Sequence, residues 1–423
     1  MMCRKLIALP ILVLLGSFAL PCLLQGADAN WPQWRGPKND GISPAKDAPI
    51  EWGPDKNVVW KFKMPGRGSS TPCIWGDSIF LTDIEGSDVV LMCIGTDGKQ
   101  RWKENISIAG KAGRGEEGND ASASCSTDGK HVWAFAGSGK LVCYTVAGKP
   151  VWDVDVRKYG KLATQFGIHW TPVLYKDKLF LQVMHRGAQM VVALEAGTGK
   201  EFWQVQRPGY GKGESPDTYS SAFMWEGERE ALLITHGNDY CTAHKLDDGK
   251  EVWRVAGLNP TNNGAWRFVS SPLVTPNLIV IPSCKNGPTV GLNPVGAQGT
   301  INPDNKAEIW RYKSTPDVVS PLLVDSIVYL LDNGPLTALD AKTGMQIYRK
   351  DLPKQTYRSN MVAADGKIFV VSREGMGSVV QAGKEFKLLA TNDLKEKVYA
   401  SPAIVDGRIY IRTWENLYCF GKK

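Results

Sequence analysis

Aromatic, acidic, basic and imidazole side chains gather in the polar segments of the first two thirds of this sequence. A flat ring beside carboxylate, amide or guanidinium groups suits the recognition of a glycan or a peptide, because it combines an apolar face with directional hydrogen bonds. The residues of this kind, which we select as candidates for binding, are Arg114, Glu116, His169, Trp170, His185, Asp217, Tyr219, Asn238, Asp239, Trp266 and Arg267.

Each of these residues also has a plain alternative as a solvated loop residue or a packed ring, and a lone histidine such as His169 more often packs than ligates. Asp217 with Glu116 or Asp239 offers oxygen ligands for calcium, but without EF-hand spacing. The sequence has no HExxH, no GxSxG and no Cys/His cluster with zinc spacing. We therefore expect no catalytic residue and no metal site.

A repeat decides how these residues are positioned. Gly-Lys-x-x-Trp occurs four times at intervals of fifty or fifty-one residues, and its tryptophans are Trp102, Trp152, Trp203 and Trp253. Each unit holds about four short runs rich in β-branched and aromatic residues, separated by Gly and Asp turns, which predicts strands joined by hairpins. A four-stranded sheet that recurs at this period is the unit of a β-propeller.

The units can be counted by a short anchor that precedes each first strand. The anchors lie near Pro72, Ala123, Pro172, Ala222, Pro272, Pro321, Met361 and Pro402. The eighth unit has only three strand-like runs, and segment 58–62 near the N-terminus can supply the fourth, which leaves no open sheet edge. The prediction is an all-β, eight-bladed propeller of four-stranded antiparallel blades, and seven blades is the alternative.

One large ring in each outer strand is expected to wedge between neighbouring blades. These docking residues are Trp60, Trp102, Trp152, Trp203, Trp253, Trp310 and Tyr348. The pattern decays along the chain, because the fifth unit carries an insertion at 293–306 and the seventh has Lys387 where the ring is expected.

Residues 1–29 are expected to be a secretory signal peptide, with basic residues before an apolar core and small residues near Ala29. Cys22 allows a lipoprotein anchor, but Pro21 precedes it where a small residue is needed, so cleavage near Ala29 is favoured. Residues 30–57 are expected to form a Trp-rich extension that packs on the propeller, and residues 58–423 form the propeller. The mature protein is therefore predicted to be exported, periplasmic or secreted, without a transmembrane segment.

The distribution of charge argues against a nucleic acid as the partner. The whole chain has a formal charge of +7, with the charges dispersed and no run of one sign, so a nucleic acid is not expected.

Cys93 and Cys143 lie nine residues before a docking tryptophan, where other units have alanine. They are therefore interpreted as small packing residues, and a disulfide involving Cys73 or Cys125 stays open.

The anchors and the repeated Gly-Lys-x-x-Trp resemble the tryptophan-docked blades of pyrroloquinoline-quinone-type β-propellers. That superfamily includes quinoprotein alcohol dehydrogenases and the lipoprotein scaffold of outer-membrane β-barrel assembly. The opening Trp-Pro-Gln-Trp-Arg-Gly-Pro at 31–37 looks like the signature of a planctomycete branch of exported propeller proteins.

Two functions follow from this resemblance. Quinoprotein dehydrogenases are similar in using adjacent cysteines, a calcium ion and an aspartate base around the quinone, whereas this sequence has no Cys-Cys pair and no CxxCH haem site. We therefore expect no cofactor, and a non-catalytic scaffold that binds a protein, a peptide or an envelope polysaccharide through one lopsided rim, formed by the long polar loops of the first half. A dehydrogenase that uses pyrroloquinoline quinone and calcium in an unusual pocket is the alternative.

Overall fold

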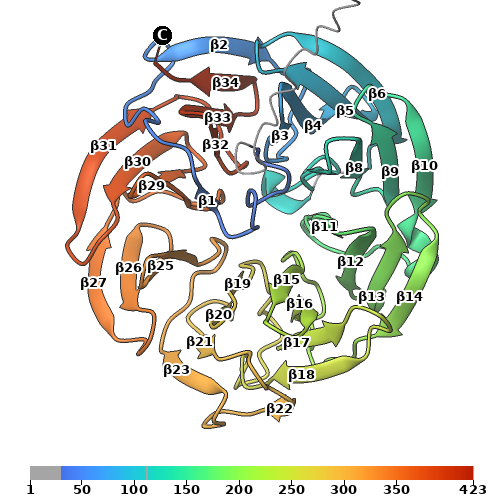
Figure 1. Ribbon diagram of the computed structural model, residues 1–423, viewed down its shortest axis with the longest axis vertical. Coiled ribbons are helices and arrows are strands. Elements are labelled where there is room, and N and C mark those ends of the chain that lie inside the picture. The colour runs from blue at the N-terminus through green and yellow to red at the C-terminus, as the bar shows by residue number, and fades with distance from the viewer. Residues whose placement is uncertain (1–29, 111–112, 423) are drawn as a thin grey trace, which may run out of the picture.

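The computed structural model describes residues 30–110 and 113–422, so the predicted signal peptide and Cys22 lie outside the described residues. Within these ranges the strands form eight sheets arranged as blades around a central channel (Figure 1). The helical elements of the described residues are two short 3₁₀ turns, η2 (Arg114–Glu116) and η3 (Val156–Tyr159). The predicted all-β, eight-bladed propeller is confirmed.

The first four blades follow one another along the chain from the innermost strand outwards. Blade 1 contains β3 (Cys73–Trp75), β4 (Ser78–Glu85), β5 (Asp88–Gly95) and β6 (Gln100–Ile108); blade 2 contains β7 (Ser126–Thr127), β8 (His131–Phe135), β9 (Lys140–Thr145) and β10 (Pro150–Asp155). Blade 3 contains β11 (Val173–Tyr175), β12 (Lys178–His185), β13 (Ala188–Glu195) and β14 (Glu201–Gln206); blade 4 contains β15 (Phe223–Glu226), β16 (Ala231–Gly237), β17 (Tyr240–Lys245) and β18 (Glu251–Val255).

The last four blades continue the same order. Blade 5 contains β19 (Leu273–Val274), β20 (Ile279–Pro282), β21 (Thr289–Leu292) and β23 (Glu308–Tyr312); blade 6 contains β24 (Leu322–Val324), β25 (Ile327–Leu331), β26 (Pro335–Asp340) and β27 (Gln346–Asp351). Blade 7 contains β28 (Val362–Ala364), β29 (Lys367–Val371), β30 (Met376–Gln381) and β31 (Lys387–Asp393); blade 8 contains β32 (Ala403–Val405), β33 (Arg408–Arg412) and β34 (Asn416–Phe420).

The two ends of the propeller close the ring together. Strand β2 (Val58–Lys63) pairs antiparallel with β34 and supplies the outer strand of blade 8, as the sequence predicts (Figure 1). Behind this seam the fully buried Arg412 of blade 8 pairs with Asp83 of blade 1 at 2.7 Å. Asp83 also accepts the backbone N–H groups of Gly66 and Gly68, which satisfies the buried carboxylate.

The docking tryptophans tie each blade to the next one. In five of them the indole Nε1 donates to a carbonyl oxygen of the next blade at 2.8–2.9 Å. The indole also covers a glycine of positive φ, where an added Cβ would lie 2.6–2.9 Å from the ring. These five are Trp60, Trp102, Trp152, Trp203 and Trp310. A side chain at the turn would therefore push the indole out of the seam.

Trp253 is accommodated differently. The insertion that follows blade 5's third strand folds back as β22 (Gly299–Ile301), which pairs parallel with β18 and gives blade 4 a fifth strand. Trp253 is fully buried against this strand, and its Nε1 has no hydrogen-bond partner among the described residues. The insertion therefore replaces the glycine turn as the cover of this indole.

Blade 7 corrects one expectation. The docking position, one residue after the bulge in the outer strand, is occupied by Ala390, which lies opposite Val379, and not by Lys387. The docking position lies eleven residues after its paired residue in blade 7 (Val379 to Ala390) and ten in blade 3 (Ala193 to Trp203), so Gly383-Lys384 stands earlier in its turn than the Gly-Lys of blade 3. Trp52 of the N-terminal extension packs at this seam instead, 6.2 Å from Phe369 and 6.3 Å from Phe420.

The extension, residues 30–57, crosses the ring before it reaches β2 (Figure 1). Trp31 forms a bridge with Ile74 of blade 1, and β1 (Ile42–Ser43) pairs parallel with β28 of blade 7. Between them the buried Arg35 donates to the carbonyl oxygen of Pro321 in blade 6 at 2.8 Å. The segment therefore lies against the inner strands of several blades and obstructs the channel.

A closed ring of hydrogen bonds joins the anchors of all eight blades. In each anchor one backbone N–H donates to the side-chain oxygen of the equivalent residue in the next blade, at 2.7–3.2 Å. In ring order these residues are Thr71, Ser124, Thr171, Ser221, Ser271, Ser320, Asn360 and Ser401, and Ser401 returns to Thr71. We call this set the girdle.

Candidate functional site

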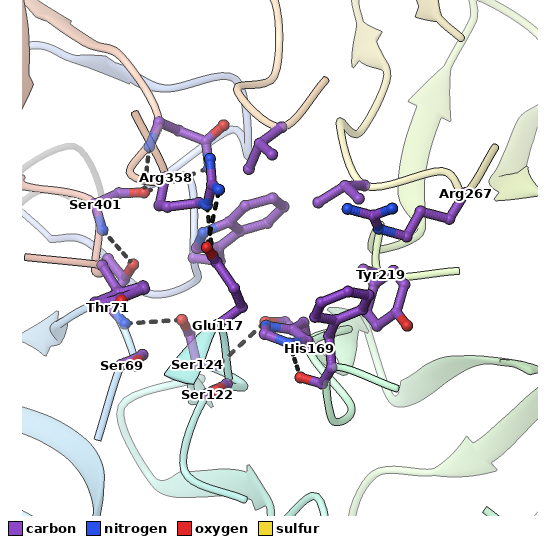
Figure 2. Close-up of a pocket in the computed structure, with 17 residues that line it drawn as sticks. Ser69, Thr71, Glu117, Ser122, Ser124, His169, Tyr219, Arg267, Arg358 and Ser401 are labelled. Atoms are coloured by element: carbon purple, nitrogen blue, oxygen red, sulfur yellow. Dashed lines mark hydrogen bonds and ion pairs between the residues drawn. The ribbon is translucent and has the colours of Figure 1, made fainter. Parts of the chain in front are cut away.

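A cavity of about 210 Å³ occupies the mouth of the channel, on the face formed by the loops that lead into the innermost strands (Figure 2). Its lining includes the residue two positions before the girdle residue in every blade. We call these eight residues the wall: Ser69, Ser122, His169, Tyr219, Val269, Val318, Arg358 and Tyr399.

The cavity is closed at its inner end. In blade 1 the chain passes from the wall at Ser69 to the girdle at Thr71 and then to Ile74, which pairs with Trp31. The extension therefore lies beyond the girdle as seen from the wall. Its Trp34 lines the cavity and packs against Phe223, with ring centroids 6.2 Å apart. A ligand can enter from the mouth, and Trp34 limits how far it penetrates.

The single carboxylate in the cavity lining is already neutralised. Glu117 binds Arg358 through two contacts, of 2.6 and 2.9 Å, and Arg373 at 3.2 Å. Burial disfavours the charge of Glu117, but the hydrogen bonds and charges of the two arginines outweigh it and lower the pKa of the carboxyl. The loop that carries Glu117 thereby reaches from blade 2 to blade 7.

Arg267 is the second guanidinium in the lining. Its Nη1 donates to Glu214 at 3.2 Å, and its Cζ lies 4.6 Å from the ring centroid of Phe166. Figure 2 shows Arg267 and Tyr219 on one side of the cavity, with Ser69, Thr71 and Ser401 on the other. One ion pair uses little of the hydrogen-bonding capacity of a guanidinium, which has five N–H groups.

His169 and Tyr219 form an aromatic corner. Their ring centroids are 5.5 Å apart in an edge-on arrangement, and His169 Nε2 lies 2.7 Å from the carbonyl oxygen of Phe166. Burial lowers the pKa of His169, so its imidazole is neutral near pH 7. Burial also raises the pKa of Tyr219 to about 12, which keeps its hydroxyl protonated.

The structure brings three of the eleven sequence-selected residues together in the cavity: His169, Tyr219 and Arg267. Glu116 lies at the rim, in ion pairs with Arg67 at 3.3 Å and Lys397 at 3.1 Å. Arg114 is exposed on η2, next to this rim.

The other six lie outside the cavity lining. Trp170 is fully buried and stacks on Phe135 at 4.3 Å. The remaining five are held by contacts within the loops and blades: His185 accepts from the N–H of Gly187, Asp217 pairs with Arg186, Asn238 bonds Gln189, Asp239 bonds Asn259, and Trp266 packs on Gly287. These positions have structural contacts that explain their residue types.

The cavity also uses residues that sequence reasoning did not select, and it is not confined to the first half of the chain. Arg358, Tyr399 and Val318 come from blades 7, 8 and 6, and Trp34 comes from the extension. A usable signal was present, because each wall residue stands two positions before an anchor hydroxyl or amide. The repeat therefore marks the wall, although a search for reactive residue types does not.

Comparison with known proteins agrees with this architecture. Residues 93–290 and 297–385, more than half of the chain, match the family described as outer membrane protein assembly factor BamB. The chain belongs to this family. No protein with curated function matches it by sequence.

Solved structures of similar fold include a BamB protein and two dehydrogenases. BamB from Moraxella catarrhalis aligns with a TM-score of 0.62 at 14% identity, covering 86% of this chain and 97% of that one. The quinohemoprotein alcohol dehydrogenase from Comamonas testosteroni aligns with a TM-score of 0.69 at 15% identity, covering 93% and 81%. A europium-containing methanol dehydrogenase aligns with a TM-score of 0.69 at 13% identity, covering 93% and 98%. At these identities the likeness concerns the fold.

The cavity does not fit a calcium-bound quinone. Calcium is held by several oxygen ligands, carboxylates above all. The single lining carboxylate, Glu117, is bound by two arginines, and the described residues contain no group of three His, Cys, Asp or Glu arranged to hold a metal. The seven cysteines of the described chain are all buried and unpaired, and none lines the cavity.

The described ranges also lack any helix of the length and apolarity that a membrane span needs. Membership of a family described as an outer membrane protein assembly factor points to the cell envelope.

Proposed function

We propose that this chain is an exported binding protein of the cell envelope that holds part of a protein or peptide partner in the channel mouth, without covalent chemistry. The partner enters the cavity past the wall and contacts the surrounding rim. Arg267, Arg358, Tyr219 and Tyr399 orient it, and Trp34 limits how deeply it inserts.

The observation that carries this proposal is that the ionisable groups of the cavity are already engaged. Glu117 is held ionised by Arg358 and Arg373, and His169 is neutral with Nε2 at a carbonyl oxygen. Tyr219 keeps its proton far above neutral pH. General acid–base chemistry is most efficient when the pKa of the group lies near the working pH, and the pKa values of Glu117, His169 and Tyr219 are each shifted away from neutrality.

The family supports a protein as the partner, because its description names an assembly factor for outer membrane proteins. An envelope polysaccharide stays the second kind of partner, because the wall joins aromatic rings with hydroxyl donors. The test below separates the two.

Site-specific photo-crosslinking in cells of the source organism tests the proposal. A photoreactive phenylalanine replaces Val318 in the wall, and the matched control carries it at Lys99, an exposed turn residue between β5 and β6 outside the cavity. We expect a protease-sensitive adduct from position 318 that is weak or absent from position 99. Adducts that resist protease but yield to glycan hydrolases would identify the polysaccharide instead.

A variant of the cavity that weakens partner contact completes the test. Arg267→Ala should reduce the adduct at position 318 without lowering the amount of folded protein. Equal adducts at positions 318 and 99 would refute the proposal. A stoichiometric quinone absorbance after adding pyrroloquinoline quinone and calcium to the purified protein would refute it in favour of the dehydrogenase.

A further inference from the structure

We propose that the group bound in the cavity is a carboxylate carried on an apolar or aromatic body. This inference rests on the proposed function and specifies the chemistry of the ligand. It follows from four properties of the cavity: its hydrogen-bond donors, its charges, its apolar side and its closed end.

Several hydroxyl groups of the lining have no acceptor for their O–H within the described residues. The girdle hydroxyls of Thr71, Ser124, Thr171 and Ser401 each accept a backbone N–H, and none donates to another described residue, so their O–H groups are free to donate. Ser69 has no side-chain hydrogen bond within the described ranges, so its O–H is also free to donate. A ligand that satisfies these donors must bring acceptor oxygens.

The charges favour an anion. In and behind the lining, the three arginines Arg267, Arg358 and Arg373 are balanced by three carboxylates, those of Glu117, Glu214 and Glu374. At the rim, Arg67 and Lys397 share one carboxylate, that of Glu116. The nearby His169 adds no negative charge. The positive excess therefore lies at the rim, where Arg67 and Lys397 are exposed and added salt screens it.

The guanidinium groups favour a carboxylate in particular. Arg358 holds Glu117 through two parallel contacts, and Arg267 already binds the carboxylate of Glu214. The planar fork of a guanidinium matches the two oxygens of a carboxylate. Arg267 makes one of its five N–H contacts within the described residues, so it retains donors for a second carboxylate.

The part of the lining next to Arg267 is largely apolar. Val269 and Val318 form the wall in blades 5 and 6, next to Tyr219 of blade 4 and Phe166 of the loop before blade 3. Trp34 closes the inner end. An aromatic or branched apolar group fits between these residues while its carboxylate reaches Arg267 and the girdle hydroxyls.

The size and the closed end limit the ligand to a small group or the end of a chain. About 210 Å³ is less than the roughly 300–1,000 Å³ of a common small-molecule pocket. A polymer cannot thread through the channel, because the extension lies across it. The carboxylate therefore belongs either to the C-terminal residue of a partner protein or to a free aromatic acid.

Ligand-observed NMR with the purified protein tests the inference with two pairs of probes. The first pair is 2-naphthoate and 2-naphthamide, and the second is one pool of random peptides with free or amidated C-termini. We expect each acid to bind about tenfold more tightly than its amide, since a charge-assisted hydrogen bond is lost in the amide. The pair with the larger ratio tells whether a chain end or a free acid is the natural source.

Variants assign the preference to the cavity. Arg267→Gln should abolish the acid–amide ratio, Arg267→Lys should restore part of it, and the exposed Arg349→Gln on β27 should leave it unchanged. Thermal unfolding of each variant verifies that it folds. Equal binding of acid and amide, no binding of either pair, or displacement of both acids by inorganic phosphate at equal concentration would overturn the inference. If the crosslink at position 318 persists in any of these cases, the proposed function survives and only the carboxylate is rejected.

Discussion

The girdle and the wall stand two residues apart in every blade, yet they differ in kind. The girdle has seven hydroxyl residues and Asn360, all with a side-chain oxygen that accepts an N–H from the blade before it. The wall has two serines, two valines, two tyrosines, a histidine and an arginine. Eight equivalent positions keep one chemistry where the side chain joins blades and diversify where it faces the cavity.

This difference separates scaffold from site. A girdle position must satisfy a buried backbone N–H, and few side chains do so at that distance. A wall position contacts the cavity, so its type depends on what enters there. Changes in the girdle and behind it should therefore lower stability, whereas changes in the wall should alter binding.

Among changes that act on the scaffold, acidification should produce the largest loss of unfolding free energy. His185, His236 and His244 are buried in blades 3 and 4, and burial lowers their pKa values to about 4, 3 and 4. In the unfolded chain a histidine titrates near pH 6.5, so below that pH the unfolded state binds more protons. Stability should be full above about pH 6.5 and fall by several kcal/mol as the pH drops to about 4. Denaturant unfolding across this range measures it.

His236→Phe provides the control for this effect, because it removes the histidine with the lowest pKa and keeps a ring against Phe268. The variant should lose less stability on acidification than the wild type. An identical pH dependence would show that His236 is not responsible.

Breaking the ion pair at the seam between blades 8 and 1 should produce the next largest loss of stability. Arg412→Met removes the cation from a fully buried ion pair and leaves Asp83 with its backbone donors alone. Loss of one partner of a buried pair costs about 3–5 kcal/mol. Urea unfolding should show this loss, and the double variant Arg412→Met, Asp83→Leu should recover part of it. A cost below about 1 kcal/mol would mean that the seam is solvated.

A matched pair of serine variants tests the girdle against the wall. Ser271→Ala leaves the buried N–H of Ser221 without its acceptor and should cost about 1–3 kcal/mol. Ser69→Ala removes a wall hydroxyl without a hydrogen bond to the described residues and should stay within about 0.5 kcal/mol. Equal losses of unfolding free energy in the two variants would remove the distinction between the sets.

The fold could be predicted from the sequence because the repeat carries it. The spacing of Trp102, Trp152, Trp203 and Trp253 sets the blade, and the missing strand of the last unit points to segment 58–62. What could not be predicted are local departures from the repeat. The insertion before β23 adds a strand to blade 4 rather than widening its own blade, and in blade 7 the Gly-Lys pair stands earlier in the turn, so that Ala390 takes the docking position.

The site was harder to predict for a physical reason. Reactive residue types such as His185 and Asp217 occur where blades pack and loops are tied together, as well as where a ligand enters. Type alone therefore selected many structural residues together with His169, Tyr219 and Arg267. Position relative to the anchors is more informative, and it would have included Val318, which no search for reactive groups selects.

Two residues in one loop of blade 6 have different roles: Val318 contacts what enters the cavity, and Ser320 joins two blades. The variants Val318→Glu and Ser320→Ala test this division most directly. Unfolding free energy and 2-naphthoate binding are measured for both variants. We expect Val318→Glu to abolish binding by placing a negative charge in the cavity while unfolding stays near wild type, and Ser320→Ala to lower stability while binding persists. If both variants lose stability and binding in parallel, girdle and wall are one structural layer and the account is wrong.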